Sequence, residues 1–433
     1  MRRYVCLSAL LLASLAVSAQ EEQGKLTLDA QLRSRGEYRN GALMPRDEGE
    51  QPATFVNERA RLSMQYDRSD NLTLRFSAQH TGVFGQDPQV DKQGRLAIAE
   101  AWVGMKFADN FFGRLGRQPL VYDDERLLGA LDWNTAGRYH DAGVLMYKDT
   151  HNELHAVGAF NQNAERIAGN YYDSGAQPYK LLMMMWYRYT AQRFPLGVSL
   201  LALNLGKEKG NPETGEGAVS HQQTMGTYIR VHPQLWDVEA SFYYQMGKRG
   251  TPTKAWMASL ACGVNFSDEW RLSAGYDYLS GQDDDDQGDT NHAFDPLYGT
   301  HHKFYGYMDY FFASSWGLMP RGFLELTQRQ YNPGLQDMHG RLSYRPKPGM
   351  DFRVDYHYFA SAAKLSGSVR GLGHEVDVQA SVPLMKDVTL QAGYSFMLGQ
   401  NTMDIVKGGH YKSWQDWAWI QFNVSTRLFS KRL

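Results

Sequence analysis

The sequence has little cysteine, and beyond its N-terminal segment it has no long apolar run. It contains 2 cysteines in 433 residues. Cys6 lies in the apolar N-terminal segment, so Cys262 alone remains in the rest of the chain and no internal disulfide is expected. The mean hydropathy is −0.51 and 21% of the residues are charged, which excludes a helical membrane protein beyond the first residues. Stability must therefore come from hydrophobic packing or from a closed topology.

The sequence also lacks an excess of one charge sign. It has 45 Lys plus Arg and 47 Asp plus Glu, for a net charge of −2. This balance gives no reason to expect a nucleic-acid partner, and we predict none. No Gly-rich phosphate-binding motif occurs between a strand and a helix. Any electrostatic function must therefore come from the local placement of charges.

The first residues are typical of a secretory signal. Arg2 and Arg3 form a basic start, and a short apolar run leads to a small-residue cleavage site that ends at Ala19. We therefore predict a signal peptide over residues 1–19 and an exported mature chain over residues 20–433.

Alternation of polar and apolar residues is the main pattern of the mature chain. It begins after Gly24, in the run Leu26-Thr27-Leu28-Asp29-Ala30-Gln31-Leu32-Arg33. A period of two residues is typical of β-strands with one apolar face. Such segments recur to the C-terminus and number about 20, including the segments 303–313 and 317–331.

The connections between these segments alternate between tight turns and long polar loops. This pattern predicts an all-β protein, a single transmembrane antiparallel β-barrel of about 18 to 20 strands in the lipid of a bacterial outer membrane. The short turns would be periplasmic and the long loops extracellular. A soluble β-sandwich is the alternative, but a sandwich of this length would divide into domains, and no Pro/Ser-rich linker interrupts the pattern.

Arginine is concentrated on the polar face of the first three predicted strands. That face has two acids, Asp29 and Glu37, and five arginines: Arg33, Arg35, Arg59, Arg61 and Arg75. Arginine remains charged, and its planar guanidinium pairs with carboxylate or phosphate in two-point contacts. Two interpretations stay open: the arginines line a path for anions, or they brace the wall of a wet lumen by pairing with acids.

A dense polar segment follows the predicted strand at 111–118. It contains Gly116-Arg117-Gln118, the run Tyr122-Asp123-Asp124-Glu125-Arg126-Leu127, then Asp132-Trp133 and Gly137-Arg138-Tyr139-His140-Asp141-Ala142. Residues 96–147 resemble the signature region of the alginate-export family of outer-membrane β-barrel porins. The resemblance implies a monomeric barrel, an arginine-rich pore for a polyuronate, and loops folded into the lumen.

Three more arginines are candidates for the pore: Arg114, Arg117 and Arg138. Strand parity points Arg114 toward the lumen and Arg117 away from it. The resemblance favours Arg117 in the pore, and a β-bulge would reconcile the two.

The connection 119–140 is predicted to fold inward and to narrow the pore. Its leucines and Trp133 gain little at an exposed tip, whereas each large side chain that is fully buried stabilises by about 1.5–3 kcal/mol. We expect Asp123, Asp124 or Glu125 to pair with inward arginines, and Arg117 and Arg138 to flank the narrowest point. The candidate constriction residues are Asp123, Asp124, Glu125, Arg126, Asp132, Trp133 and Asp141. A cap packed on neighbouring extracellular loops is the alternative.

The sequence thus predicts an outer-membrane channel for small anionic solutes or an anionic polysaccharide such as a polyuronate. We predict no catalytic residues, no cofactor and no metal site. Two other functions remain open. A barrel enzyme acting on lipid or peptide would need a nucleophile and a base at the loop side, near His140, and a surface adhesin would have a lumen closed by loops.

Overall fold

The computed structural model describes residues 24–433 except 44, 90–94, 173–176, 212–215, 287, 312–332 and 366–368. The predicted signal peptide lies outside these residues. No helix among the described residues is long and apolar enough to cross a bilayer. The described residues form a short 3-10 helix η1 (His301–Lys303), a helix α3 (Asn401–Lys407) and eighteen strands: β1 (Gly24–Asn40), β2 (Ala53–Arg68), β3 (Leu72–Val83), β4 (Leu96–Ala108), β5 (Phe111–Gln118), β6 (His140–Lys148), β7 (Asn152–Phe160), β8 (Leu181–Thr190), β9 (Leu196–Asn211), β10 (Glu216–Val231), β11 (Trp236–Arg249), β12 (Thr251–Asn265), β13 (Trp270–Leu279), β14 (Leu335–Tyr344), β15 (Asp351–Ala360), β16 (Gly371–Met385), β17 (Val388–Gly399) and β18 (Gln415–Arg432).

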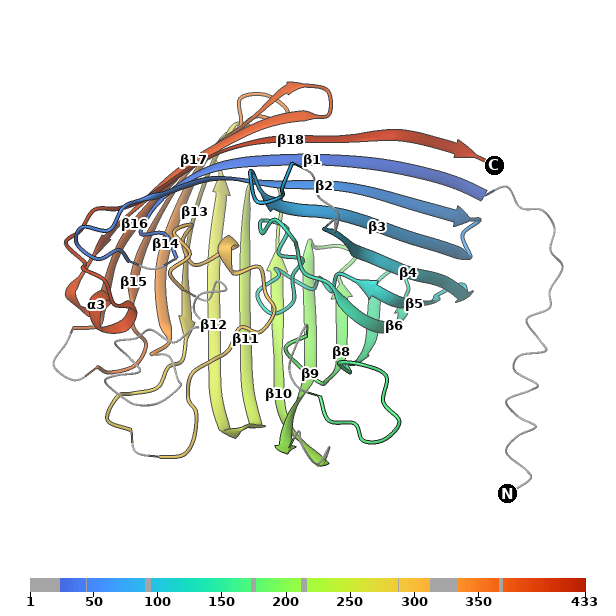
Figure 1. Ribbon diagram of the computed structural model, residues 1–433, viewed down its shortest axis with the longest axis horizontal. Helices are drawn as coiled ribbons and strands as arrows, with labels where there is room; N and C mark the ends of the chain where they lie inside the picture. Colours follow the sequence, from blue (N-terminus) through green and yellow to red (C-terminus); the bar gives the residue numbers. More distant parts are fainter. Residues whose placement is uncertain are drawn as a thin grey trace.

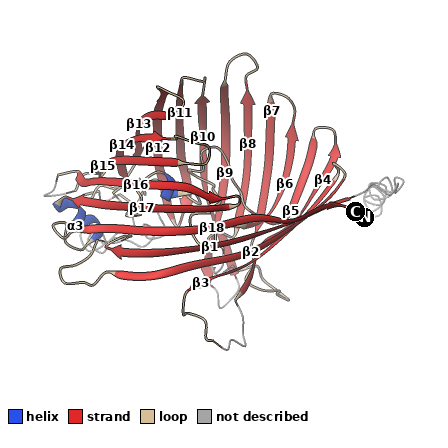
Figure 2. Ribbon diagram, turned by 90° about the horizontal axis from the view of Figure 1, so that it is seen from above, coloured by secondary structure: helices blue, strands red, loops and turns tan. Residues whose placement is uncertain are grey.

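The strands close into one antiparallel barrel (Figure 1, Figure 2). Each strand pairs with the next in the chain, and β18 pairs with β1 from Asn40↔Asp416 to Lys25↔Arg432. At the seam, the backbone N–H of Leu433 also donates to the carbonyl of Gly24 at 2.7 Å. In lipid no water can satisfy the backbone, so closure without an open edge is what a membrane-spanning sheet requires.

The eighteen strands fall within the predicted range of 18 to 20, but the count of 20 alternating segments was too high by two. Lys303, the first residue of the predicted strand 303–313, belongs to η1, and the residues that follow, as far as Phe311, form no strand. The other segment, 317–331, lies outside the described residues. Because β13 pairs directly with β14, the barrel closes with eighteen strands. The aromatic spacing that resembled a strand has another cause: Tyr305, Tyr307 and Phe311 are buried against the inner wall.

Apolar side chains of the strands face outward and polar side chains face the lumen, as the sequence predicts. Leu32, Leu62 and Met64 remain exposed at 46%, 48% and 41% on the outer face, where lipid would cover them. Arg33 and Arg59, which have the opposite parity on the same strands, are 7% and 0% exposed on the inner face. The polar half of each strand therefore builds the lumen.

The two ends of the barrel differ in their connections. At one end the strands are joined by short turns, at 69–71, 109–110, 149–151, 191–195, 232–235, 266–269, 345–350 and 386–387. The first strand begins at this end of the barrel, and the last strand ends there. The connections at the other end include the long ones, at 41–52, 84–95, 119–139, 161–180, 280–334, 361–370 and 400–414.

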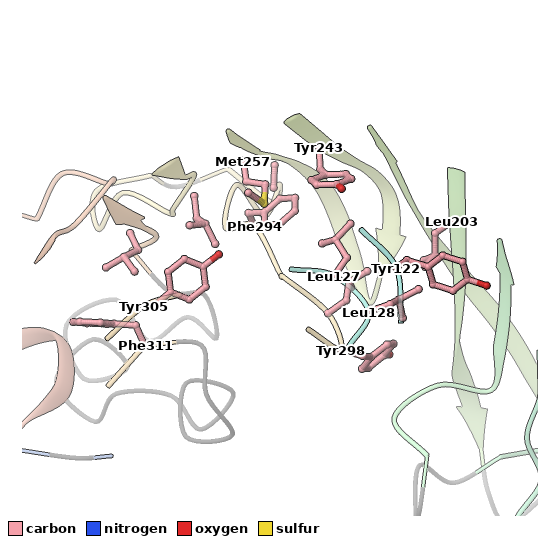
Figure 3. Close-up of a cluster of buried hydrophobic side chains, with 14 of the residues drawn as sticks. Tyr122, Leu127, Leu128, Leu203, Tyr243, Met257, Phe294, Tyr298, Tyr305 and Phe311 are labelled. Atoms are coloured by element: carbon pink, nitrogen blue, oxygen red, sulfur yellow. The ribbon is translucent and has the colours of Figure 1, made fainter. Parts of the chain in front are cut away.

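Two of the long connections meet inside the barrel. We call residues 119–139 the β5–β6 loop and residues 280–311 the β13–β14 loop. They are joined by an isolated parallel bridge between Leu128 and Tyr298. Around this bridge, apolar side chains from both loops pack on the inner faces of strands between β6 and β13 (Figure 3). Leu128 and Phe294 are completely buried in this cluster, and each contributes about 1.5–3 kcal/mol by its burial.

Closure of the sheet predicts resistance to detergent. Purified protein should show a β-dominated circular dichroism spectrum and should migrate faster on a denaturing gel when unheated than when boiled. The reason is that a closed ladder of backbone hydrogen bonds has no free edge from which to unfold. A mainly helical spectrum, or identical migration of heated and unheated samples, would contradict the fold.

Candidate functional site

The inner faces of β1 and β2 bring like charges together. Arg33 lies opposite Arg59 in the register, and Arg61 lies opposite Gln31. Adjacent arginines on neighbouring strands repel each other unless an anion or a polar group lies between them. Here the group between them comes from the β5–β6 loop.

One carboxylate of that loop meets three guanidinium groups. Asp132 Oδ1 accepts a hydrogen bond from Arg59 Nη1 at 2.8 Å and lies 3.9 Å from Arg61 Nη1. Its second oxygen lies 3.7 Å from Arg33 Nη1. The side chain of Asp132 is 60% exposed, whereas those of Arg33 and Arg59 are 8% and 0% exposed. The three arginines therefore form a carboxylate-binding subsite whose occupant is reachable by solvent.

Backbone carbonyls of the same loop add to this contact. Arg33 donates to the carbonyls of Asp132 at 2.6 Å and Asn134 at 2.9 Å. Arg35 donates to the carbonyl of Trp133 at 3.1 Å. The tip of the β5–β6 loop is thus held on the arginine-bearing wall by charge-assisted hydrogen bonds.

Trp133 places an aromatic stack beside the subsite. The guanidinium of Arg35 lies over its ring at 4.1 Å. On another side the ring stacks with His302, with centroids 4.3 Å apart and an interplanar angle of 7°. His302 in turn stacks with Tyr307 at 4.8 Å. The tip of the β5–β6 loop is therefore packed between the wall and the β13–β14 loop.

The beginning of the β5–β6 loop is attached to other sectors of the wall. Asp123 accepts hydrogen bonds from Trp186 Nε1 on β8 at 3.0 Å and Ser199 Oγ on β9 at 2.6 Å. Burial raises the pKa of the Asp123 carboxyl above its usual value. Arg126 pairs with Asp277 on β13 at 2.7 Å. Since β1, β8 and β13 lie in different sectors of the barrel, the loop crosses the lumen.

Among the described contacts, the acidic run 123–125 has partners other than the arginines of β1 to β3. Asp124 pairs with Arg126 of its own loop at 2.8 Å, and Asp132 is the acid that reaches the arginine wall. The reason is position: the run lies near β8, β9 and β13, in other sectors of the barrel from β1 to β3.

Glu125 and Arg138 hold the two inward loops together. Glu125 Oε2 accepts a hydrogen bond from Thr300 Oγ1 at 2.8 Å, and Lys303 lies 3.4 Å from the same carboxylate. Arg138 donates to the carbonyl of Gly299 at 2.7 Å. Burial lowers the pKa of Arg138 to about 10, so the guanidinium stays charged at neutral pH. Arg138 is thus part of the contact between the loops.

Arg114 and Arg117 lie on opposite faces of β5. The guanidinium of Arg114 lies over the ring of Trp102 on β4 at 4.7 Å. Arg117 alternates with Arg114, shares the parity of the exposed Leu115, and pairs at the rim with Asp141 at 3.2 Å. The pairing of β5 with β6 is regular through this point, with no bulge to turn Arg117 inward.

A cavity of about 460 Å³ opens toward the end with the short turns. Arg61 lines it together with Arg75, and Arg427 of β18 adds a third cation. Its acids are Asp29 and Asp387. Because Arg61 also lies near Asp132, one side chain connects this cavity with the carboxylate subsite.

Several contributors to the site are not evident in the sequence. Gln79 on β3 accepts a hydrogen bond from Arg61 Nε at 2.9 Å and donates to the carbonyl of Ala136 at 2.8 Å. His302 and Trp419 pack around Trp133 from distant parts of the chain. Strand alternation in the sequence indicates that Gln79 faces inward. Its hydrogen-bond partners could not be predicted from the sequence, because they depend on where the β5–β6 loop docks.

The described architecture defines the class of the protein. A closed barrel with an apolar exterior, a polar lumen and loops folded inside is that of an outer-membrane channel. The chain belongs to the alginate export family, because the family model described as "Alginate export" matches residues 25–314, more than half of its length.

Solved porin structures share this fold at low sequence identity. OccAB1 of Acinetobacter baumannii superposes with a TM-score of 0.62 at 12% identity, over 93% of this chain and 97% of that chain. OccK9 (OpdG) of Pseudomonas aeruginosa gives 0.60 at 13% identity, over 93% and 98% of the chains. A BenF-like porin from Pseudomonas fluorescens Pf-5 gives 0.60 at 12% identity, over 93% and 99%. No curated protein matches this chain.

The three-arginine contact predicts the effect of neutralising Asp132. In Asp132→Asn the loop keeps its shape but loses the one negative charge that three guanidinium groups share, so the lumen becomes more attractive to anions. In a salt gradient the reversal potential of single channels should shift toward the equilibrium potential of the anion. Asp141→Asn, which removes an acid at the rim, is the control and should shift it less. Equal reversal potentials for wild type and a folded Asp132→Asn would refute the electrostatic role of this contact.

Proposed function

We propose that this outer-membrane channel passes anionic solutes that carry carboxylates, either small molecules or a polyuronate. The observation that carries the proposal is the convergence of Arg33, Arg59 and Arg61 on the single carboxylate of Asp132. Three cations share one anion, so the group has a local charge of +2. A solute carboxylate has the same chemistry as the Asp132 side chain and can take its place.

The distribution of polar and apolar side chains supports a route along one side of the lumen. Between β6 and β13 the inner wall is covered by apolar packing from the two inward loops, with Leu182 and Met257 completely buried. The wall formed by β18, β1, β2 and β3 is polar and borders the cavity at the short-turn end. We place the solute route on this polar side.

The spacing of the arginines suits a solute that moves by successive exchanges. On β2, Arg59 and Arg61 are two residues apart, which is about 6–7 Å along a strand. Arg61 lies next in the direction of the short-turn cavity. Several weak sites at such intervals let a polyanion advance without being held tightly at any one of them.

The bracing interpretation also has support. Arg35 pairs with Glu37 at 2.9 Å, Arg75 with Glu100 at 3.4 Å, and Arg427 with Asp29 at 3.1 Å. The pairs of Arg75 and Arg427 are one-to-one and contribute no net charge, whereas Glu37 is shared by Arg35 and Arg39. All of these contacts stabilise the wall. We therefore assign the anion-binding role to the group around Asp132 and the bracing role to the paired arginines.

We further propose that the functional unit is a monomer without catalytic activity. One chain encloses the whole lumen, so no second chain is needed to complete the route. His140, the candidate base of a barrel enzyme, is 1% exposed, and its Nδ1 lies 2.7 Å from the hydroxyl of Tyr179. A residue so enclosed is poorly placed to act on lipid or peptide, and an ion current through the purified protein would argue against an adhesin with a closed lumen.

Removal of the subsite charges should reverse the selectivity. We expect the triple variant Arg33→Gln, Arg59→Gln, Arg61→Gln to shift the single-channel reversal potential toward the equilibrium potential of the cation. The reason is that three positive charges are removed from a lumen whose wall has a low dielectric constant. It should also abolish block of the ion current by an added polyuronate. The matched control, Arg117→Gln, Arg193→Gln, Arg345→Gln, removes the same charge outside the subsite and should retain both properties. Unchanged selectivity and block in the folded subsite variant would leave only the bracing role.

The position of the loop tip predicts its effect on conductance. Replacing residues 131–136 with Gly and Ser removes Asp132 and Trp133 while keeping the Arg126 anchor to Asp277, so the barrel should fold and conduct more current per channel. A Gly/Ser replacement of residues 47–51, in the exposed part of the β1–β2 connection, is the control and should conduct as wild type does. A loop-tip variant with wild-type conductance would show that this segment does not narrow the route.

A further inference from the structure

Five carboxyl groups are buried on the inner wall formed by β13 to β16. They are 0 to 2% exposed: Asp277, Asp337, Asp355, Glu375 and Asp377. In the register Asp277 lies opposite Asp337, and Asp355 lies opposite Asp377. Like charges directly opposite on neighbouring strands are destabilising, and burial of a carboxylate is costly unless a positive charge accompanies it.

The positive charges around these carboxyl groups are fewer than the carboxyl groups. Arg126 pairs with Asp277, Arg341 pairs with Asp355, and His357 donates to Asp337. Arg126 is shared with Asp124 and His357 with Asp377, so the carboxyl groups outnumber the positive charges even with His357 counted as an imidazolium. Protons or a cation would balance this group.

Unpaired oxygen atoms favour a cation. Among the described residues, Asp277 Oδ1 and Glu375 Oε2 are buried without a hydrogen-bond donor. Buried polar atoms without a partner are rare in folded proteins, and an ion is one of the few groups that satisfies them.

Three side chains of this group have the spacing of metal ligands. Asp277, Asp337 and His339 each offer one ligand atom, and these atoms lie within 4.8 Å of one another. The unpaired Asp277 Oδ1 faces His339 Nε2 at 4.0 Å. Two ligand bonds of about 2.0–2.2 Å each reach across the 4.0 Å between Asp277 Oδ1 and His339 Nε2.

The surroundings of the three side chains orient them as in known metal sites. His357 Nδ1 donates to the two oxygens of Asp337 at 2.9 and 3.0 Å, and Arg126 holds the other oxygen of Asp277 at 2.7 Å. Hydrogen bonds of this kind fix the direction of metal-binding carboxylates. The side chain of His339 is 22% exposed, which offers an entry from the lumen.

We propose that Asp277, Asp337 and His339 bind one divalent first-row transition ion, such as Zn²⁺ or Mn²⁺. Imidazole together with carboxylates suits these ions, whereas Ca²⁺ and Mg²⁺ prefer oxygen ligands alone. The bound ion joins β13 to β14 beside the Arg126 anchor and adds positive charge to this wall. The site is independent of the proposed anion route, since none of its ligands belongs to the arginine subsite.

The test is metal binding by the full chain in detergent after treatment with a chelator. Equilibrium dialysis with elemental analysis should give one Zn²⁺ or Mn²⁺ per chain, and Mn²⁺ bound to the wild type should show nitrogen coupling in its paramagnetic resonance spectrum. His339→Ala and Asp337→Asn should each lower the affinity at least about 10-fold. The control His374→Ala removes a histidine on β16 that pairs with Tyr356, and it should bind as the wild type does.

Each other outcome would overturn the proposal. A folded wild type that binds neither ion at micromolar concentration would leave protons as the balancing charges. Wild-type affinity in His339→Ala would place the ion elsewhere, and equal competition by Ca²⁺ would contradict the ion class. If His339→Ala does not show the folded migration of an unheated sample on a denaturing gel, His339→Gln and the nitrogen coupling in the wild type decide the question. The triple arginine variant should still bind the metal, so failure of the transport proposal is distinguishable from failure of this one.

Discussion

The structure depends on one constraint: in lipid every backbone hydrogen bond must be made within the sheet. Pairing of β18 with β1 meets this constraint and removes both edges. Closure then sorts the side chains, because a two-residue period puts one face of each strand in lipid and the other in the lumen. All the polar chemistry of the barrel is thereby concentrated in one enclosed space, where charges interact strongly because the surrounding wall has a low dielectric constant.

The charges of the lumen explain the course of the β5–β6 loop. The wall of β1 and β2 carries an excess of arginine, and the wall of β13 to β16 carries an excess of buried acid. The loop presents Asp132 to the first wall and Arg126 to the second. Its apolar middle, around Leu128, packs with the β13–β14 loop between these two contacts. The loop therefore spans the lumen because its charges are complementary to both walls and its apolar residues need burial.

Much of the fold was predictable because it depends on local periodicity. The inward parity of Arg33, Arg59 and Arg61 followed from alternation, and the apolar content of the 119–140 connection indicated burial. The strand count was not predictable in the same way. Residues of the β13–β14 loop such as Tyr305 and Tyr307 are spaced like a strand because they pack inside the barrel, and burial produces the same pattern as an extended segment.

The sequence by itself determined the class of protein, since a period of two residues and alternating connection lengths are properties of neighbouring residues. The tertiary structure alone decided which charges meet. Strand register placed Asp277 opposite Asp337, and the docking of the loop gave Asp132 three arginines while Asp123 received Trp186 and Ser199. Contacts of this kind join residues that are distant in the sequence: Arg126 and Asp277, for example, are 151 positions apart. No local pattern specifies such a pair, because it depends on how far each strand is offset from its neighbour around the whole barrel.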